Sequence, residues 1–239
     1  MSNGYIYIAS NNVGGLHNIN YVNEAIYSAK SLRKVDPNAN ITLFTNKKVD
    51  TNIFNNIIIV NTSLRCKQNF FEKSPYKKTI YIDSDTYINN SVNDIFKLLD
   101  KYEILCSHDY GRKRNLPIPE YMKIPYGFSE LNGGVIAFKK CENFTKMIKL
   151  WNSYFHKYNK IMPWDQPSFR IAVWESDIKL YVLPIEYNRR GKHTKEKCIN
   201  LRKKGDIRFN KEHLKTRIFH FHHLEKMDER VRERYAQDF

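Results

Sequence analysis

Residues 76–88 read YKKTIYIDSDTYI, and this stretch decides how the rest of the chain is interpreted. The β-prone run of Ile80, Tyr81 and Ile82 passes directly into two acidic residues, Asp83 and Asp85. Two like charges at the end of a buried strand are costly, because each raises the free energy of burying the other. A divalent cation would neutralise them, and their hard oxygen ligands suit Mg²⁺ or Mn²⁺. A plain polar turn is the alternative interpretation of Asp-Ser-Asp.

The run IYIDSDTYI resembles the D-x-D strand of nucleotide-sugar-dependent glycosyltransferases with the GT-A fold. The closest pattern is that of glycosyltransferase family 8, which includes glycogenin and galactosyltransferases. The resemblance implies an α/β fold with a Rossmann-like, mostly parallel central sheet flanked by helices in a single domain. It also implies a nucleoside diphosphate sugar donor, such as a UDP-sugar, bound through Mn²⁺ or Mg²⁺ at Asp83 and Asp85, with Ser84 contacting the nucleotide.

The composition agrees with a globular protein that binds anions. The chain has 239 residues, which suits one α/β domain, and its formal net charge is +15. Such a charge favours nucleotide phosphates, acidic glycans, anionic lipid headgroups or nucleic acid as partners. The sequence shows no signal peptide and no apolar run of roughly eighteen residues, so we expect a cytoplasmic protein without a transmembrane segment. Peripheral membrane contact is compatible with the charge, and the four widely spaced cysteines are expected to be free thiols.

The first sixty residues alternate between strand and helix patterns. Residues 4–10, 41–45 and 57–60 are predicted strands, and residues 20–34 have the apolar spacing of an amphipathic helix. This order predicts a βαβ arrangement with a ligand crevice at the carboxyl ends of the strands. The resemblance implies that the end of the first strand holds the nucleobase and ribose. The residues assigned to the nucleotide on this basis are Ile8, Ala9 and Ser10.

Two further binding positions follow from the resemblance. Residues 63–73 are a predicted helix ahead of the D-x-D strand, and Lys67 is assigned to the nucleotide, with Arg65 as its competitor. Asp109 follows the next predicted strand, and the resemblance assigns it to the hydroxyl groups of the donor sugar. A turn residue is the alternative interpretation of Asp109.

A glycine pair follows the long loop of residues 112–130. Asn132, Gly133 and Gly134 precede the apolar run 135–138, which predicts a strand. Two glycines there permit unusual dihedral angles and close approach of a ligand, and a tight turn is the alternative. Because the segment resembles the family's N-[ST/G]-G-V strand, donor-sugar contact is assigned to Asn132, Gly133 and Gly134.

The tetrapeptide of residues 164–167 reads WDQP. Asp165 is a suitable N-cap for a following helix, and proline is tolerated in the first helical turn. The segment also resembles the Asp-Gln pair of the family. The resemblance implies that Asp165 and Gln166 line the donor sugar and the acceptor as catalytic residues.

Residues 217–223 read RIFHFHH and are predicted to form a strand. His220 and Lys226 resemble the family's H-x-x-G-x-x-K, in which the histidine is the third metal ligand and the lysine holds the diphosphate. His223 replaces the glycine of that pattern, which leaves His222 as a rival ligand. The basic stretch before this strand is expected to be a solvated face, or to meet an anionic acceptor.

These assignments divide the single domain, residues 1–239, into functional parts. Residues 1–110 are the nucleotide-binding half, residues 111–224 the sugar and acceptor half, and residues 225–239 a charged tail.

Together the patterns predict a glycosyltransferase that moves a sugar from a nucleoside diphosphate to a hydroxyl group of a glycan or another acceptor. The resemblance favours retention of configuration, with Gln166 near the anomeric carbon, whereas inversion would need a base such as Asp165. A sugar-nucleotide nucleotidyltransferase is one alternative, although residues 11–15 carry no basic phosphate loop. A nucleic-acid-binding protein driven by the positive charge is another, and we do not expect nucleic acid as the partner.

Overall fold

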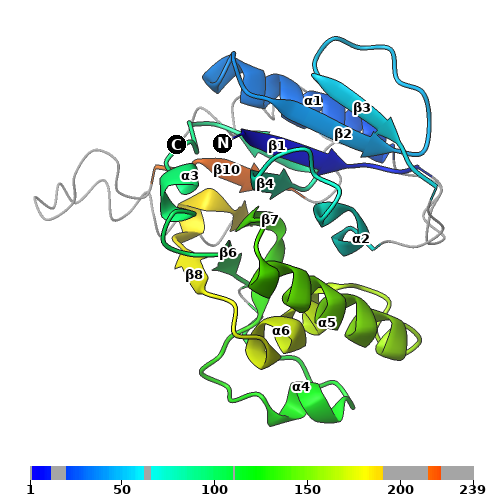
Figure 1. Ribbon diagram of the computed structural model, residues 1–239, viewed down its shortest axis with the longest axis vertical. Coiled ribbons are helices and arrows are strands. Elements are labelled where there is room, and N and C mark those ends of the chain that lie inside the picture. The colour runs from blue at the N-terminus through cyan, green and yellow to red at the C-terminus, as the bar shows by residue number, and fades with distance from the viewer. Residues whose placement is uncertain (1, 12–19, 62–65, 110, 191–214, 222–239) are drawn as a thin grey trace, which may run out of the picture.

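The computed structural model describes residues 2–11, 20–61, 66–109, 111–190 and 215–221, which form two sheets and the helices around them (Figure 1). Across the large sheet the strands are β3 (Asn56–Ile59), β2 (Ile41–Thr45), β1 (Asn3–Ile8), β4 (Lys78–Ile82), β7 (Leu131–Lys139), β6 (Ile104–His108) and β8 (Leu180–Leu183). Neighbouring strands are parallel, except that β7 runs antiparallel to β4 and β6. The predicted single α/β domain with a mostly parallel sheet is therefore confirmed.

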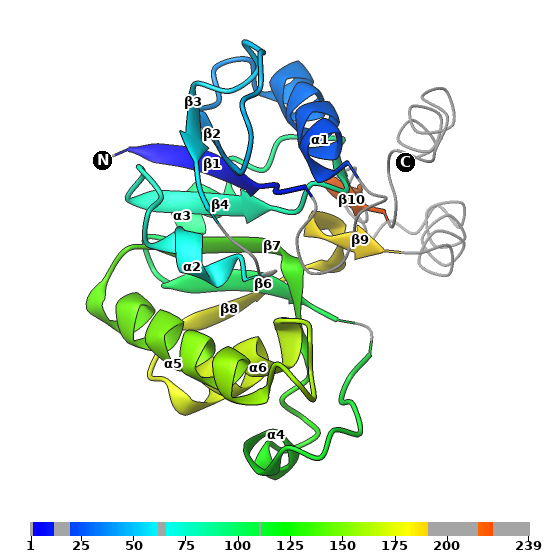
Figure 2. The ribbon, with the colours of Figure 1, turned by 90° about the vertical axis from the view of Figure 1, so that its right-hand side faces the viewer.

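Both faces of the large sheet are buried. Tyr5 and Tyr7 of β1 face a hydrophobic core completed by α1 (Tyr21–Val35) and α3 (Ile95–Leu98), whereas Ile6 faces a second core. That second core is completed by α2 (Gln68–Phe71), α5 (Glu142–Tyr158) and α6 (Gln166–Glu175) (Figure 2). Because side chains alternate along a strand, near-continuous apolar runs such as those of β1 and β4 are what a sheet covered on both faces requires.

A small sheet lies beyond the carboxyl end of β4 (Figure 2). It consists of β5 (Thr86–Ile88), β10 (Ile218–His220) and β9 (Arg189–Arg190), with β10 in the middle, antiparallel to β5 and parallel to β9. The 3₁₀ turn η1 (Ile185–Tyr187) leads into β9. The small sheet thus brings the C-terminal part of the chain next to the D-x-D segment.

Three details of the fold differ from the prediction. β7 is longer than the apolar run alone, and it includes Asn132, Gly133 and Gly134 rather than starting after them. The loop of residues 112–130 contains the helix α4 (Pro119–Lys123), which packs on α6 through a separate apolar cluster. The segment before β4 holds only one short helix among its described residues, and Lys67 immediately precedes it.

No helix in the described part of the chain is both long and apolar enough to cross a membrane. Cys106 and Cys141 form no disulfide bond with any described residue, and Cys198 lies outside the described residues.

Candidate active site

Asp83 and Asp85 lie in the connection between the two sheets, where β4 ends and β5 begins. The backbone N–H of Asp83 donates to the carbonyl oxygen of Gly134 in the large sheet, and the carbonyl oxygen of Asp85 accepts from the N–H of Phe221 beside the small sheet. The two side chains are 25% and 22% exposed. Both carboxylates are therefore held on a fixed backbone and remain within reach of a ligand.

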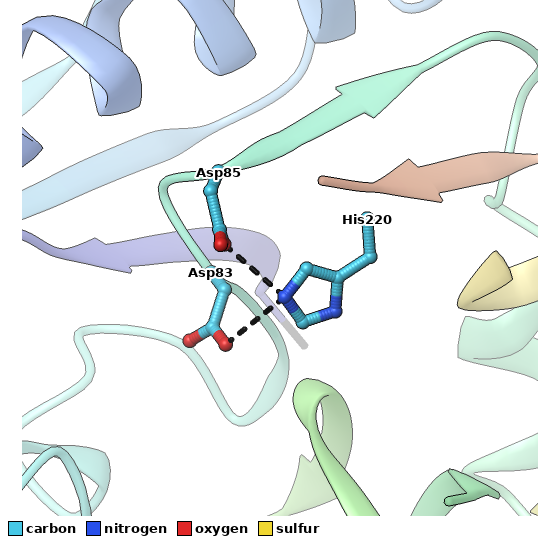
Figure 3. A group of neighbouring side chains, drawn as sticks. All are labelled: Asp83, Asp85 and His220. Carbon is cyan, nitrogen blue, oxygen red and sulfur yellow. Dashed lines mark ion pairs between the residues drawn. The ribbon is translucent and has the colours of Figure 1, made fainter. Parts of the chain in front are cut away.

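His220 reaches this connection because β10 pairs with β5, which places it opposite Thr86. Its Nε2 lies 3.1 Å from Oδ1 of Asp85 and 3.6 Å from Oδ2 of Asp83, and its side chain is only 4% exposed. Figure 3 shows one ring nitrogen directed at both carboxylates. One ligand atom from each of the three residues lies within 4.8 Å of the others. The structure thus brings together the three predicted metal ligands.

The opposite ring nitrogen of His220 ends a buried chain of hydrogen bonds. Nδ1 lies 2.9 Å from Oδ1 of Asn188, whose Nδ2 donates to Oδ1 of Asn132 at 2.7 Å. Asn132 Oδ1 also accepts the backbone N–H of Gly134 at 2.8 Å, and its Nδ2 donates to Oδ2 of Asp109 at 2.9 Å. Since a backbone N–H can only donate, it fixes the orientation of both amides. His220 Nδ1 must therefore be the donor to Asn188, and Nε2 faces the carboxylates.

This donor set fits a divalent cation. In a neutral ring whose Nδ1 carries the hydrogen, Nε2 presents a lone pair, and a lone pair beside two carboxylates is repelled unless a cation lies between them. Ligands bonded to one ion at about 2.1 Å are separated by roughly 3–4 Å, which is the range found between His220 and the two aspartates. Two carboxylates and one imidazole are ligands that Mn²⁺ accepts.

Asp83 is oriented by two further side chains. Lys67 Nζ lies 3.2 Å from its Oδ1, and the hydroxyl group of Tyr81 donates to the same oxygen, so that Oδ2 is the oxygen facing His220. Burial opposes ionisation of Asp83, but the charge and hydrogen bond of Lys67 and the hydrogen bond from Tyr81 lower the pKa of this carboxyl group. Burial, reinforced by Asp83, raises the pKa of Tyr81 far above its ordinary value, so Tyr81 remains a donor.

Lys67 also connects this cluster to Asp165 and Gln166. Its Nζ donates to the carbonyl oxygen of Gly133 at 2.8 Å and lies 3.6 Å from Oδ2 of Asp165. Asp165 occupies the N-cap position of α6, but its side chain caps no backbone N–H, so the predicted capping role is wrong. Asp165 Oδ2 and Gln166 Nε2 are both buried and have no hydrogen-bond partner among the described residues. Buried polar atoms of this kind usually find a partner, such as an ordered water molecule or a ligand.

The two glycines in β7 provide space for side chains from elsewhere. Neither adopts the left-handed backbone conformation, so the predicted unusual dihedral angles are absent at Gly133 and Gly134. A Cβ atom at Gly134 would lie 2.1 Å from Cε1 and 2.3 Å from Nδ1 of His220, and one at Gly133 would lie 3.2 Å from Nζ of Lys67. The close approach that glycine allows here is therefore to His220 and Lys67.

Asp109 has the turn role that was the alternative interpretation of its position, and it also supports Asn132. Its Oδ1 accepts the backbone N–H of Gly111 at 2.8 Å, which is the predicted turn role, while Oδ2 supports Asn132 and lies 3.6 Å from Nη1 of Arg190. Asp109 and Asn132 are 5% and 2% exposed. Their contact with a donor sugar stays a prediction.

The residues assigned to the nucleotide lie where β1 and β4 end. Ile8 closes β1, Ala9 continues the pairing with β2 through its N–H, and the buried hydroxyl group of Ser10 has no hydrogen-bond partner among the described residues. Ser84 turns its hydroxyl group toward Glu24 of α1, with 3.4 Å between the oxygens. Nucleotide contact by these residues stays a prediction. Arg65, His222 and Lys226 lie outside the described residues.

Sequence reasoning missed two residues of this cluster, Tyr81 and Asn188. Tyr81 was read as part of an apolar strand, although its position two residues before Asp83 puts both side chains on the same face. Asn188 carries no motif at all, because its role depends on the pairing of β9 with β10.

No protein-family model and no curated protein matches the chain. Solved structures do match. The galactosyltransferase LgtC in complex with donor and acceptor sugar analogs is 12% identical, with 92% of this chain and 87% of that chain covered and a TM-score of 0.59. The apo form of the glycosyltransferase GlyE from Streptococcus pneumoniae TIGR4 is 13% identical, with 100% and 60% covered and a TM-score of 0.63. Mouse xyloside xylosyltransferase 1 is 10% identical, with 95% and 100% covered and a TM-score of 0.56.

These likenesses cover 92–100% of this chain. Because the sequence identities are so low, they are evidence for the fold alone. The chain has the GT-A fold of these glycosyltransferase structures.

Proposed function

We propose that the protein is a glycosyltransferase that moves a sugar from a nucleoside diphosphate sugar to a hydroxyl group of an acceptor with the help of a divalent cation. The observation that carries this proposal is the meeting of Asp83, Asp85 and His220 at the carboxyl end of a central strand in a GT-A fold. Ligands of open α/β sheets bind in the crevice beyond the carboxyl ends of the strands. The likeness to a galactosyltransferase that was crystallised with sugar analogs supports the same reaction class.

The chemistry of glycosyl transfer explains why these ligands are needed. The diphosphate leaves while the sugar ring acquires positive character, so stabilising the departing negative charge is the main task. A bound Mn²⁺ or Mg²⁺ would act as a Lewis acid toward the diphosphate oxygens. Asp83, Asp85 and His220 would hold it, and the imidazole among the oxygen ligands favours Mn²⁺ over Mg²⁺. Lys67 provides a fixed positive charge beside Asp83.

The donor sugar would lie between the metal ligands and the start of α6. Lys67 contacts both Asp83 and Asp165, which places the Asp165–Gln166 pair next to the metal ligands. Oδ2 of Asp165, which lies 3.6 Å from Lys67 Nζ but accepts no hydrogen bond from a described residue, and Nε2 of Gln166 can hydrogen-bond sugar hydroxyl groups. In this proposal the donor is a UDP-sugar and the enzyme retains configuration, with Gln166 next to the anomeric carbon. An inverting enzyme would instead use Asp165 as the base toward the acceptor hydroxyl group.

A thermal-shift panel of nucleotide sugars with and without Mn²⁺ tests this proposal. A ligand present at 100 times its dissociation constant stabilises the native state by about 2.7 kcal/mol, which raises Tm of a chain this long by roughly 5–10 °C. We expect this rise for one nucleotide sugar with Mn²⁺ and its loss on chelation.

The matched variants are Asp85→Asn, which removes a metal ligand, and Asp100→Asn, which removes an exposed carboxylate paired with Lys78 at the start of β4. The proposal predicts that only Asp85→Asn abolishes the metal-dependent rise in Tm. A rise that Asp85→Asn retains would contradict it. The alternative, a nucleic-acid-binding protein, predicts a different result: its binding would survive chelation of the metal and weaken steeply as the salt concentration rises.

A further inference from the structure

The hydrogen-bond chain behind His220 has a direction and ends on a residue that no sequence motif identifies. Asn188 is 4% exposed and lies at the end of η1, immediately before β9. Its Nδ2 is committed to Asn132, and its Oδ1 faces Nδ1 of His220. The Gly134 N–H on Asn132 prevents the amide of Asn132 from rotating, and this in turn prevents rotation of Asn188.

We propose that Asn188 is a positioning residue for the metal site: its Oδ1 holds the Nδ1–H tautomer of His220 and aims the Nε2 lone pair at the space between Asp83 and Asp85. This inference rests on the proposed function, because it requires that a cation occupies that space. It extends the proposal to a residue that contacts neither the cation nor the substrate. Hydrogen-bond partners behind metal-ligating histidines fix the tautomer and ring orientation, and removing them typically weakens metal binding 10–100-fold.

Burial and rigidity make this assignment specific to Asn188. The ring of His220 is confined on one side by Gly134, where even a Cβ atom would lie 2.3 Å from Nδ1. The edge of the ring that carries Nδ1 therefore lies directly against β7 as well as against Asn188. The hydrogen-bonded series of side chains ends at Asp109. One carboxylate oxygen of Asp109 accepts from Asn132, and the other accepts the backbone N–H of Gly111. These hydrogen bonds thus fix His220, the predicted metal ligand on β10, relative to β6 and β7.

Two substitutions separate positioning from a purely structural role. Asn188→Leu has nearly the same shape but no acceptor for Nδ1, whereas Asn188→Asp retains an acceptor oxygen and loses the donor to Asn132. If Asn188 positions His220, Asn188→Leu lowers Mn²⁺ affinity 10–100-fold, and Asn188→Asp keeps it within about threefold of the wild type. If Asn188 only stabilises the fold, Asn188→Asp is the more damaging change, because it places a buried carboxylate against the carbonyl oxygen of Asn132.

The readout is binding of Mn²⁺ alone, measured from the electron paramagnetic resonance signal of the free ion, with Tm of each metal-free variant recorded in parallel. Asn143→Leu is the matched control, because Asn143 also donates from a part-buried amide, but to Glu103 just before the start of β6, at the opposite end of the strands from the site. We expect this control to bind Mn²⁺ like the wild type. If Asn188→Leu does not fold, Asn188→Ala removes the same acceptor and has the same expected loss.

The outcomes distinguish this inference from the proposed function. If the wild type binds Mn²⁺ and Asp85→Asn does not, while Asn188→Leu binds like the wild type, the positioning role is refuted and the metal site stands. An equal loss in Asn188→Leu and Asn188→Asp also refutes the positioning role. If the wild type itself binds no Mn²⁺, with or without a nucleoside diphosphate, the metal site and the positioning role both fail.

Discussion

Replacing Gly134 by alanine tests how precisely the fold places His220. An added Cβ atom would lie 2.1 Å from Cε1 of the ring, and ordinary contact begins near 3.4 Å, so the ring must move by about 1.3 Å. Metal ligands tolerate deviations of about 0.2 Å from ideal bond lengths. The displacement also breaks the 2.9 Å hydrogen bond to Asn188. Loss of the hydrogen-bond partner behind a metal-ligating histidine weakens metal binding by at most about 100-fold. Because Gly134→Ala displaces the ligand itself as well, we expect it to weaken Mn²⁺ binding by at least about 100-fold.

The assay is isothermal titration with Mn²⁺, accompanied by thermal unfolding of the metal-free protein. Crowding of a packed site costs about 1–3 kcal/mol, so Tm should fall by roughly 2–12 °C while the protein remains folded. Gly127→Ala is the control, since a Cβ atom there would meet nothing within 4 Å and Gly127 lies away from the cluster. We expect that variant to bind Mn²⁺ within a few-fold of the wild type. Unchanged Mn²⁺ affinity in folded Gly134→Ala would refute the placement of His220 as a ligand.

Three other substitutions probe separate parts of the structure. Tyr81→Phe removes the hydroxyl group that orients Asp83, so Mn²⁺ affinity should fall about tenfold with little change in Tm, and an unaltered affinity would contradict this role. Arg170→Met removes a fully buried guanidinium group that donates to two backbone carbonyl groups of the loop before β7, and urea unfolding should show a loss of about 3 kcal/mol. A loss below about 1 kcal/mol would contradict that expectation. Lys157 holds the pKa of Glu120 at about 2, below its ordinary value of 4.5, so the carboxylate contributes stability above pH 4.5 that is lost as the pH falls toward 2. The difference in Tm between wild type and Glu120→Gln should shrink over that interval, and a difference that grows in acid would disprove the pairing.

The parts of the fold that the sequence predicts well are those with continuous local patterns. The strands β1, β2 and β4 are buried on both faces, so their apolar runs stand out against polar surroundings. The amphipathic pattern of α1 likewise follows from one buried face, and Asn20 caps the helix by accepting the N–H of Asn23. Short helices such as α4 were missed, because a single turn stabilised by packing on α6 leaves little periodicity to detect.

In the candidate site, too, some residues can be predicted from a local sequence pattern, and others depend on how the strands pair. Asp83 and Asp85 are conspicuous because charge interrupts an apolar strand, and His220 is conspicuous only through its resemblance to a family motif. The role of Gly134 was predicted as close approach of a ligand, whereas the structure shows that its missing side chain makes room for His220. That contact depends on the register of β10 against β5, which is set by tertiary pairing rather than by local pattern.

Anomalous diffraction at the manganese edge, from crystals grown with Mn²⁺ and UDP, tests directly whether Asp83, Asp85 and His220 hold a metal ion. We expect one strong anomalous peak within about 2.3 Å of a carboxylate oxygen of Asp83, a carboxylate oxygen of Asp85 and Nε2 of His220. Absence of a peak between these three side chains, with UDP bound elsewhere or not at all, would contradict it.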